Sequence, residues 1–179
     1  MDRRVFFPLL AKWVLYVAIA CITLILQMVP TMELRFWLPV PDIMAVVTLV
    51  WALRHPDSVP AILVVAMALL ADFLLARPLG IAPFLLLLMS EFVRNRSRDL
   101  RKMQLLPEWA TASAALLVLI IAERMIYVMT FIQPPPLSYS LLLFLMNALI
   151  YPVVVFVSWA AFGIRKTAIG EIDDLGQVL

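Results

Sequence analysis

Several residue types that build catalytic and metal sites in proteins are scarce in this sequence. It contains one cysteine, one histidine and four glycines. A single cysteine excludes an internal disulfide and a cysteine-based metal cluster, and a single histidine without neighbouring ligands does not predict a metal site. There is also no glycine-rich nucleotide-binding motif and no serine–histidine–acid pattern. We therefore expect no enzyme activity, no cofactor, no bound metal and no nucleic-acid partner.

Charged residues are scarce as well. They make up 15% of the 179 residues, whereas 65% are hydrophobic, and the mean hydropathy is +1.03. A soluble domain has about 45–50% apolar residues. The excess is too large to bury in a protein core, so the composition predicts an integral membrane protein.

The apolar residues fall into six runs, each close to the roughly 20 residues that a helix needs to cross a bilayer. They cover residues 9–29, 36–53, 59–76, 78–93, 109–132 and 136–162. We predict an all-α protein with about six transmembrane helices, in a single polytopic domain over 1–164, followed by a short cytoplasmic tail at 165–179. Five spans remain an alternative, because Glu91 lies near the end of the fourth run.

Lysines and arginines are distributed asymmetrically between the loops. If both termini are cytoplasmic, eleven of these residues lie on the cytoplasmic side, and only Arg35 and Arg77 lie outside. Positive residues concentrate on the cytoplasmic side of membrane proteins. The asymmetry therefore predicts a multi-pass membrane protein with cytoplasmic termini.

A few polar residues interrupt the apolar runs at a similar predicted depth. At 1.5 Å per residue, Asp72 lies roughly 18 Å along the third run from Pro60, in the outer half of the membrane. Similar counting places residues from four spans and the adjoining loop in the same layer: Asp42, Asp72, Arg77, Glu123, Arg124 and Asn147. Charges within a membrane usually pair and face the interior of the helix bundle.

Three interpretations of this layer remain open. It can be a set of ion pairs and hydrogen bonds that fixes the helices, a polar pocket for a ligand, or a docking surface for a partner's membrane helix. Glu123 and Arg124 are adjacent, hence about 100° apart around a helix, so we expect each to have a partner on another helix.

A basic segment follows the fourth run. We expect it to be a connector between two spans that contacts anionic lipid headgroups. Contact with an acidic cytosolic protein is a weaker alternative. The segment contains Arg94, Arg96, Arg98, Arg101 and Lys102.

Three short motifs resemble the rod shape-determining protein MreD family. They are Pro41-Asp42 at the start of the second run, the sequence LLADFL over 69–74, and Pro78-Leu79-Gly80 in the following turn. Members commonly have glycine where this sequence has Ala71 and Arg77, which affects the helix geometry near Asp72.

The resemblance implies a non-enzymatic component, in the bacterial inner membrane, of the elongation (rod) complex. This complex builds side-wall peptidoglycan and sets cell shape. Its expected partner is MreC, a single-span membrane protein, with indirect links to MreB and to the RodA–penicillin-binding-protein synthase. The family is also similar in fold to the substrate-binding subunits of energy-coupling-factor transporters. That similarity makes a small-molecule or lipid-binding membrane module the alternative function.

Overall fold

The computed structural model describes residues 3–28, 39–101 and 105–162. These residues form six α-helices and a short 3₁₀-helix, as the all-α prediction requires. The α-helices are α1 (Arg3–Met28), α2 (Ile43–Arg54), α3 (Ala61–Leu74), α4 (Ile81–Arg101), α5 (Leu105–Met129) and α6 (Leu137–Phe162), and the 3₁₀-helix η1 (Pro56–Ser58) follows α2. The predicted tail at 165–179 lies outside the described residues.

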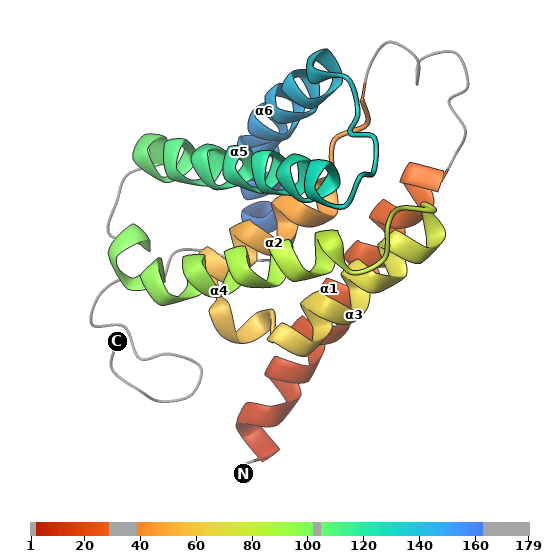
Figure 1. The fold of residues 1–179 in the computed structure, drawn as a ribbon. Helices are drawn as coiled ribbons and strands as arrows, with labels where there is room; N and C mark the ends of the chain where they lie inside the picture. Colours follow the sequence, from red (N-terminus) through yellow and green to blue (C-terminus); the bar gives the residue numbers. More distant parts are fainter. Residues whose placement is uncertain (1–2, 29–38, 102–104, 163–179) are drawn as a thin grey trace.

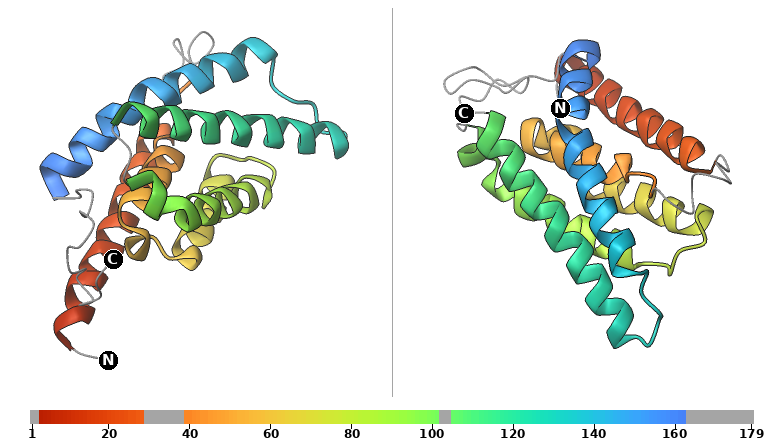
Figure 2. Two further views of the ribbon diagram at one scale, coloured as in Figure 1. Left: turned by 90° about the vertical axis from the view of Figure 1, so that its left-hand side faces the viewer. Right: turned by 90° about the horizontal axis from the view of Figure 1, so that it is seen from above.

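The helices are arranged around α2 (Figure 1). α5 and α6 pack together on one side of α2, α3 and α4 form a hairpin on the other, and α1 packs against α3 and α2. The two further views show the same arrangement, and the left view also shows the N-terminal turns of α1 extending beyond the other helices (Figure 2). Ten of the twelve residues of α2 are buried, so α2 is the core of the bundle.

Local chemistry explains why α2 and α3 are short. Pro41 and Asp42 precede α2, and the Asp42 carboxylate accepts a hydrogen bond from the Ala45 backbone N–H at 3.1 Å, which caps the helix. The helix ends before Pro56, and α3 begins directly after Pro60. Prolines disfavour helical conformation in the residue before them and lack a backbone N–H, so they limit both helices.

The six predicted runs therefore correspond to six helices, but not to six demonstrated spans. Within the described residues, three helices are long and apolar enough to cross a membrane: Leu10–Met28, Leu106–Met129 and Leu137–Ala160. α2 and α3 have 12 and 14 residues. At 1.5 Å per residue they measure about 18 and 21 Å, less than the roughly 30 Å hydrocarbon core. The number of spans stays a prediction.

The basic segment differs from its sequence prediction. It was expected to be a connector, but α4 continues through it to Arg101. The Arg94 guanidinium pairs with Glu91 at 3.2 Å and donates to the Val59 carbonyl, which ties α4 to the residues before α3. Arg96 lies 5.5 Å from the centroid of the Phe92 ring, in a cation–π contact. The side chains of Arg98 and Arg101, and all of Lys102, lie outside the described residues.

Candidate functional site: a polar cavity and a buried ion pair

The polar residues predicted to share one layer surround a single cavity of about 260 Å³. We call it the Asp72 cavity. It lies where α2 begins, where α1, α3 and α5 end, and where α4 and α6 begin. All six predicted residues line it: Asp42, Asp72, Arg77, Glu123, Arg124 and Asn147. Arg35, predicted in an external loop, lies outside the described residues.

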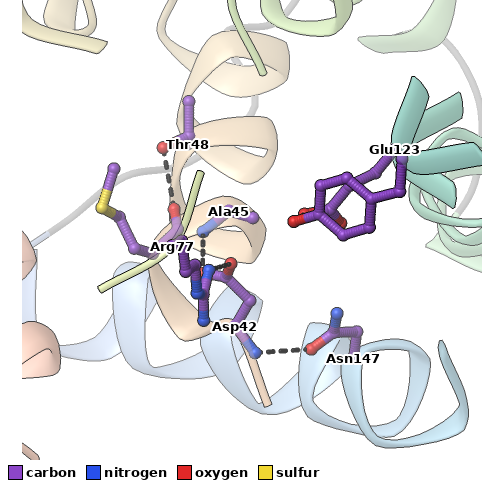
Figure 3. A network of polar contacts seen from close by, with 8 residues as sticks. Asp42, Ala45, Thr48, Arg77, Glu123 and Asn147 are labelled. Carbon is purple, nitrogen blue, oxygen red and sulfur yellow. Dashed lines mark hydrogen bonds and ion pairs between the residues drawn. The ribbon is translucent and has the colours of Figure 1, made fainter. Parts of the chain in front are cut away.

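Asp42 is the most connected member of this group. Besides capping α2, its carboxylate pairs with the Arg77 guanidinium at 3.4 Å, and its backbone N–H donates to Asn147 Oδ1 at 2.8 Å. Figure 3 shows Arg77 and Asn147 approaching Asp42 from different sides, with Glu123 further away on α5. Asp42 thus joins α2 both to the α3–α4 turn and to α6.

Arg77 lies between two carboxylates at the edge of the cavity, with a side chain that is 36% exposed. Burial lowers the pKa of its guanidinium, but the nearby Asp42 and Glu123 carboxylates outweigh that effect and raise it above its ordinary value. Arg77 is therefore charged at every physiological pH.

Asp72 stabilises the turn between α3 and α4. Its Oδ2 accepts a hydrogen bond from the Gly80 backbone N–H at 2.9 Å, so one carboxylate oxygen holds the start of α4. Gly80 has φ of 91°, a conformation that favours glycine. Pro78 is half-buried in the same turn. The turn motif noted in the sequence therefore contacts Asp72, which lies near the end of α3, through the Gly80 N–H.

The end of α3 has a left-handed residue that is not glycine. Ala76 has φ of 50°, and the Arg77 N–H donates to the Asp72 carbonyl at 2.9 Å. This is the hydrogen bond of a Schellman C-cap, where glycine is usual. Ala76 therefore occupies the position at which a glycine would relieve strain.

The two adjacent charges on α5 have different partners. Arg124 donates to the Pro135 carbonyl at 2.6 Å and lies 3.4 Å from the Ser140 hydroxyl of α6, as expected for a partner on another element. Glu123 instead accepts a hydrogen bond from Tyr127 at 2.8 Å, one turn further along the same helix. Its hydrogen bond within the described residues is therefore on its own helix, while the Arg77 guanidinium of the α3–α4 turn interacts with it electrostatically. A partner for Glu123 on another helix stays a prediction.

A second polar site lies at the other end of α2, and sequence reasoning did not find it. Arg54 Nε and Nη2 donate to the two carboxylate oxygens of Glu108 at 3.0 and 3.2 Å, and the Tyr151 hydroxyl donates to Glu108 Oε1 at 3.2 Å. Glu108 and Tyr151 are 0% exposed and Arg54 is 6% exposed. We call these three residues the Arg54 cluster.

Two further hydrogen bonds fix α2 and α5 against α6 near this cluster. The Trp51 indole N–H donates to the Ser158 hydroxyl at 3.1 Å, and the Trp109 indole N–H donates to the Ala148 carbonyl at 2.8 Å. A third, between Tyr16 and Thr48 at 2.9 Å, joins α1 to α2. This end of the bundle is therefore closed by buried, paired groups.

The sequence contained a weak signal for the Arg54 cluster. Both charges lie at the ends of apolar runs, where a charged residue normally reaches the membrane surface. The distinguishing feature was that Arg54 follows eleven uncharged residues and Glu108 precedes a tryptophan at a helix start. That pattern alone does not identify a pair separated by 54 positions.

The acidic side chains of the Asp72 cavity and the Arg54 cluster are not grouped as a metal site requires. Within the described ranges, no group of three or more histidine, cysteine or acidic side chains is close enough to hold a metal ion. Three helices long and apolar enough to cross a membrane, together with a buried ion pair and a polar cavity, indicate a helical membrane protein.

Comparison with known families gives the identification. The model of the rod shape-determining protein MreD family matches residues 9–159. Because the match covers most of the chain, this protein belongs to the MreD family, a family of cell-shape membrane proteins. Neither the curated proteins nor the solved structures gave a match.

Proposed function

We propose that this protein is a non-enzymatic inner-membrane component of the elongation (rod) complex, which binds MreC and helps to direct side-wall peptidoglycan synthesis. The observation that carries the proposal is the family match over residues 9–159. In this proposal the protein is linked to MreB and to the RodA–penicillin-binding-protein synthase through MreC, and both of its termini are cytoplasmic.

An apolar stripe along α6 supports binding through a membrane-embedded surface. Leu141, Leu145, Leu149 and Val153 are four residues apart and 51–64% exposed. Residues at this spacing lie on one helix face. A second exposed row, on α5, includes Val118, Ile121 and Met125. Such surfaces fit either lipid or a single membrane helix, and MreC supplies such a helix.

Site-specific photo-crosslinking tests the proposal. A photoreactive residue would replace Leu145 on α6, Ile121 on α5 or Ile25 on α1, and the protein would be expressed together with MreC. We expect a crosslink to MreC from at least one helix and none from a matched position buried in α2, such as Val50. The absence of a crosslink from all exposed positions, in a protein of normal yield, would contradict MreC binding through the spans.

The polar layer gives a second test of the same function. If the Asp72 cavity presents helices to MreC, Asp72→Ala and Arg124→Ala will each reduce co-purification with MreC. Glu91→Ala is the matched control, because this acid pairs with Arg94 on α4 and does not line the cavity. Unchanged complex yield in both cavity variants would show that the layer has no role in partner binding.

The cavity itself favours a second candidate function, a small-molecule or lipid-binding membrane module. A binding module of the transporter type requires a pocket, and the bundle contains one of about 260 Å³. This candidate rests on the cavity alone and is independent of MreC binding.

A further inference from the structure

The Asp72 cavity has one polar side and one apolar side. The polar side is formed by the charged residues described above, and the apolar side includes Leu24, Leu86, Leu116 and Leu143. Pro135 and Tyr139, which also line the cavity, are exposed, so the cavity reaches the surface at the turn between α5 and α6. Binding sites of this composition hold ligands with an apolar body and a few polar groups.

Two buried polar atoms beside the cavity lack hydrogen-bond partners among the described residues. They are Asp72 Oδ1 and Gln27 Nε2, in side chains of residues that are 1% and 8% exposed. A buried acceptor or donor without a partner costs about 1–3 kcal/mol, and more if it is charged. Asp72 has already used Oδ2 on Gly80, so Oδ1 is the atom available to a ligand.

The charges around the cavity select the kind of ligand. Three carboxylates, on Asp42, Asp72 and Glu123, line it together with the two guanidinium groups of Arg77 and Arg124. Arg124 is bound to the α5–α6 turn, whereas Arg77 lies at the partly exposed edge. Together these side chains carry one negative charge in excess, which favours a positive group near Asp72. An anionic group of the same ligand would have to lie beside Arg77, at the edge of the cavity.

We propose that the Asp72 cavity binds an aminophospholipid, with the primary ammonium of the headgroup donating a hydrogen bond to Asp72 Oδ1. The phosphate lies beside Arg77 and within reach of a donor such as Gln27 Nε2, and the acyl chains follow the apolar side. An ammonium with N–H groups is required, because a trimethylated nitrogen has no hydrogen to donate. This proposal develops the second candidate function and does not depend on MreC binding.

Native mass spectrometry of the purified full-length protein tests it. Phosphatidylethanolamine and phosphatidylcholine with identical acyl chains would be added separately, since they differ only in the methyl groups on nitrogen. We expect phosphatidylethanolamine to bind about tenfold more tightly, the value of one charge-assisted hydrogen bond. Equal binding of the two lipids, or tighter binding of anionic phosphatidylglycerol, would overturn the proposal.

Variants assign the preference to the cavity. Asp72→Asn keeps the shape of the side chain and removes its charge, and it is expected to abolish most of the tenfold preference. Glu91→Gln, outside the cavity, is expected to keep it. If the Asn variant retains the preference, the site is wrong. If the Asp72→Asn variant fails to fold, Glu123→Gln provides a second change of charge at the cavity. We expect Glu123→Gln to reduce the preference for phosphatidylethanolamine severalfold. An unchanged preference would count against the proposal.

Two further measurements are needed. The first distinguishes a membrane lipid from a free headgroup as the ligand, and the second distinguishes lipid binding from MreC binding. Soluble phosphoethanolamine at a concentration equal to that of the lipid should not compete for the site, because it lacks the acyl chains that fill the apolar side. Effective competition would show that a free headgroup is the ligand and would overturn the lipid proposal. MreC co-purification is measured on the same Asp72→Asn protein. Loss of lipid preference with normal MreC binding would support the lipid site alone.

Discussion

An arginine–carboxylate ion pair lies at each end of α2, and the two pairs differ in burial and in geometry. At one end, Arg54 and Glu108 form a two-pronged ion pair whose side chains are 8% and 0% exposed. At the other, Arg77 and Asp42 meet at a single distance of 3.4 Å, with side chains 36% and 30% exposed. At the first end both carboxylate oxygens of Glu108 accept hydrogen bonds. At the second, Asp72 Oδ1 has no hydrogen-bond partner among the residues that the structure describes.

This difference separates a charged group that stabilises the fold from one that is able to bind a ligand. A fully paired charge contributes rigidity, but it has no capacity left for a ligand. A cavity with an unpaired acceptor is less stable than a closed one, and it keeps that capacity. On this comparison the Arg54 cluster is structural, and the Asp72 cavity is the place to look for partners or ligands.

Breaking the Arg54 cluster should have the largest effect on stability. Glu108→Ala leaves the Arg54 guanidinium buried without its carboxylate, which costs about 3–5 kcal/mol. We expect a strongly lowered melting temperature in detergent. The double variant Arg54→Met with Glu108→Leu should recover most of the loss, because no charge then remains buried. Glu91→Ala, at a partly exposed pair, is the control and should change stability by about 0–1 kcal/mol.

The tyrosine of the cluster should contribute less. Tyr151→Phe removes the hydroxyl that donates to Glu108 and keeps the ring, so we expect a loss of about 1–2 kcal/mol. Tyr139→Phe is a matched change at the edge of the cavity, where the tyrosine is 39% exposed. A thermal unfolding series that shows equal losses for both would contradict the division into a closed and an open end.

A glycine at the α3–α4 turn should raise stability. Ala76 has φ of 50°, which costs a non-glycine residue about 1–2 kcal/mol, so Ala76→Gly should stabilise the protein by about 1 kcal/mol. The same change at Ala66, exposed in the middle of α3, should destabilise it by a similar amount. Melting temperatures that move in the same direction for both variants would show that the turn conformation is not as described.

The ion pair at the cavity should have the smallest coupling. A double-mutant cycle with Arg77→Gln and Asp42→Asn keeps a capping residue at the start of α2 and measures the pair alone. We expect a coupling of at most about 1 kcal/mol, because the pair is long and partly exposed. The equivalent cycle at Arg54 and Glu108 should give a clearly larger value. Similar couplings at both ends would remove the basis of the comparison.

Particular residues show how far the sequence could predict this arrangement. Asp72 and Asn147 were found because each is a polar residue inside an apolar run, and counting helical rise placed them at one depth. Arg54 and Glu108 were missed because charges at the ends of such runs are ordinary. The lengths of α2 and α3 were overestimated, since apolar composition continues past the caps and prolines that end the helices.

The sequence by itself determined the class of protein, the six helices and the polar residues that a membrane does not tolerate without partners. These properties depend on composition and on neighbours along the chain. Only the tertiary structure decided which polar groups pair and which remain open. Asn147 meets Asp42 across 105 positions and Glu108 meets Arg54 across 54, so the distances that separate a closed ion pair from an open cavity arise only when the helices pack.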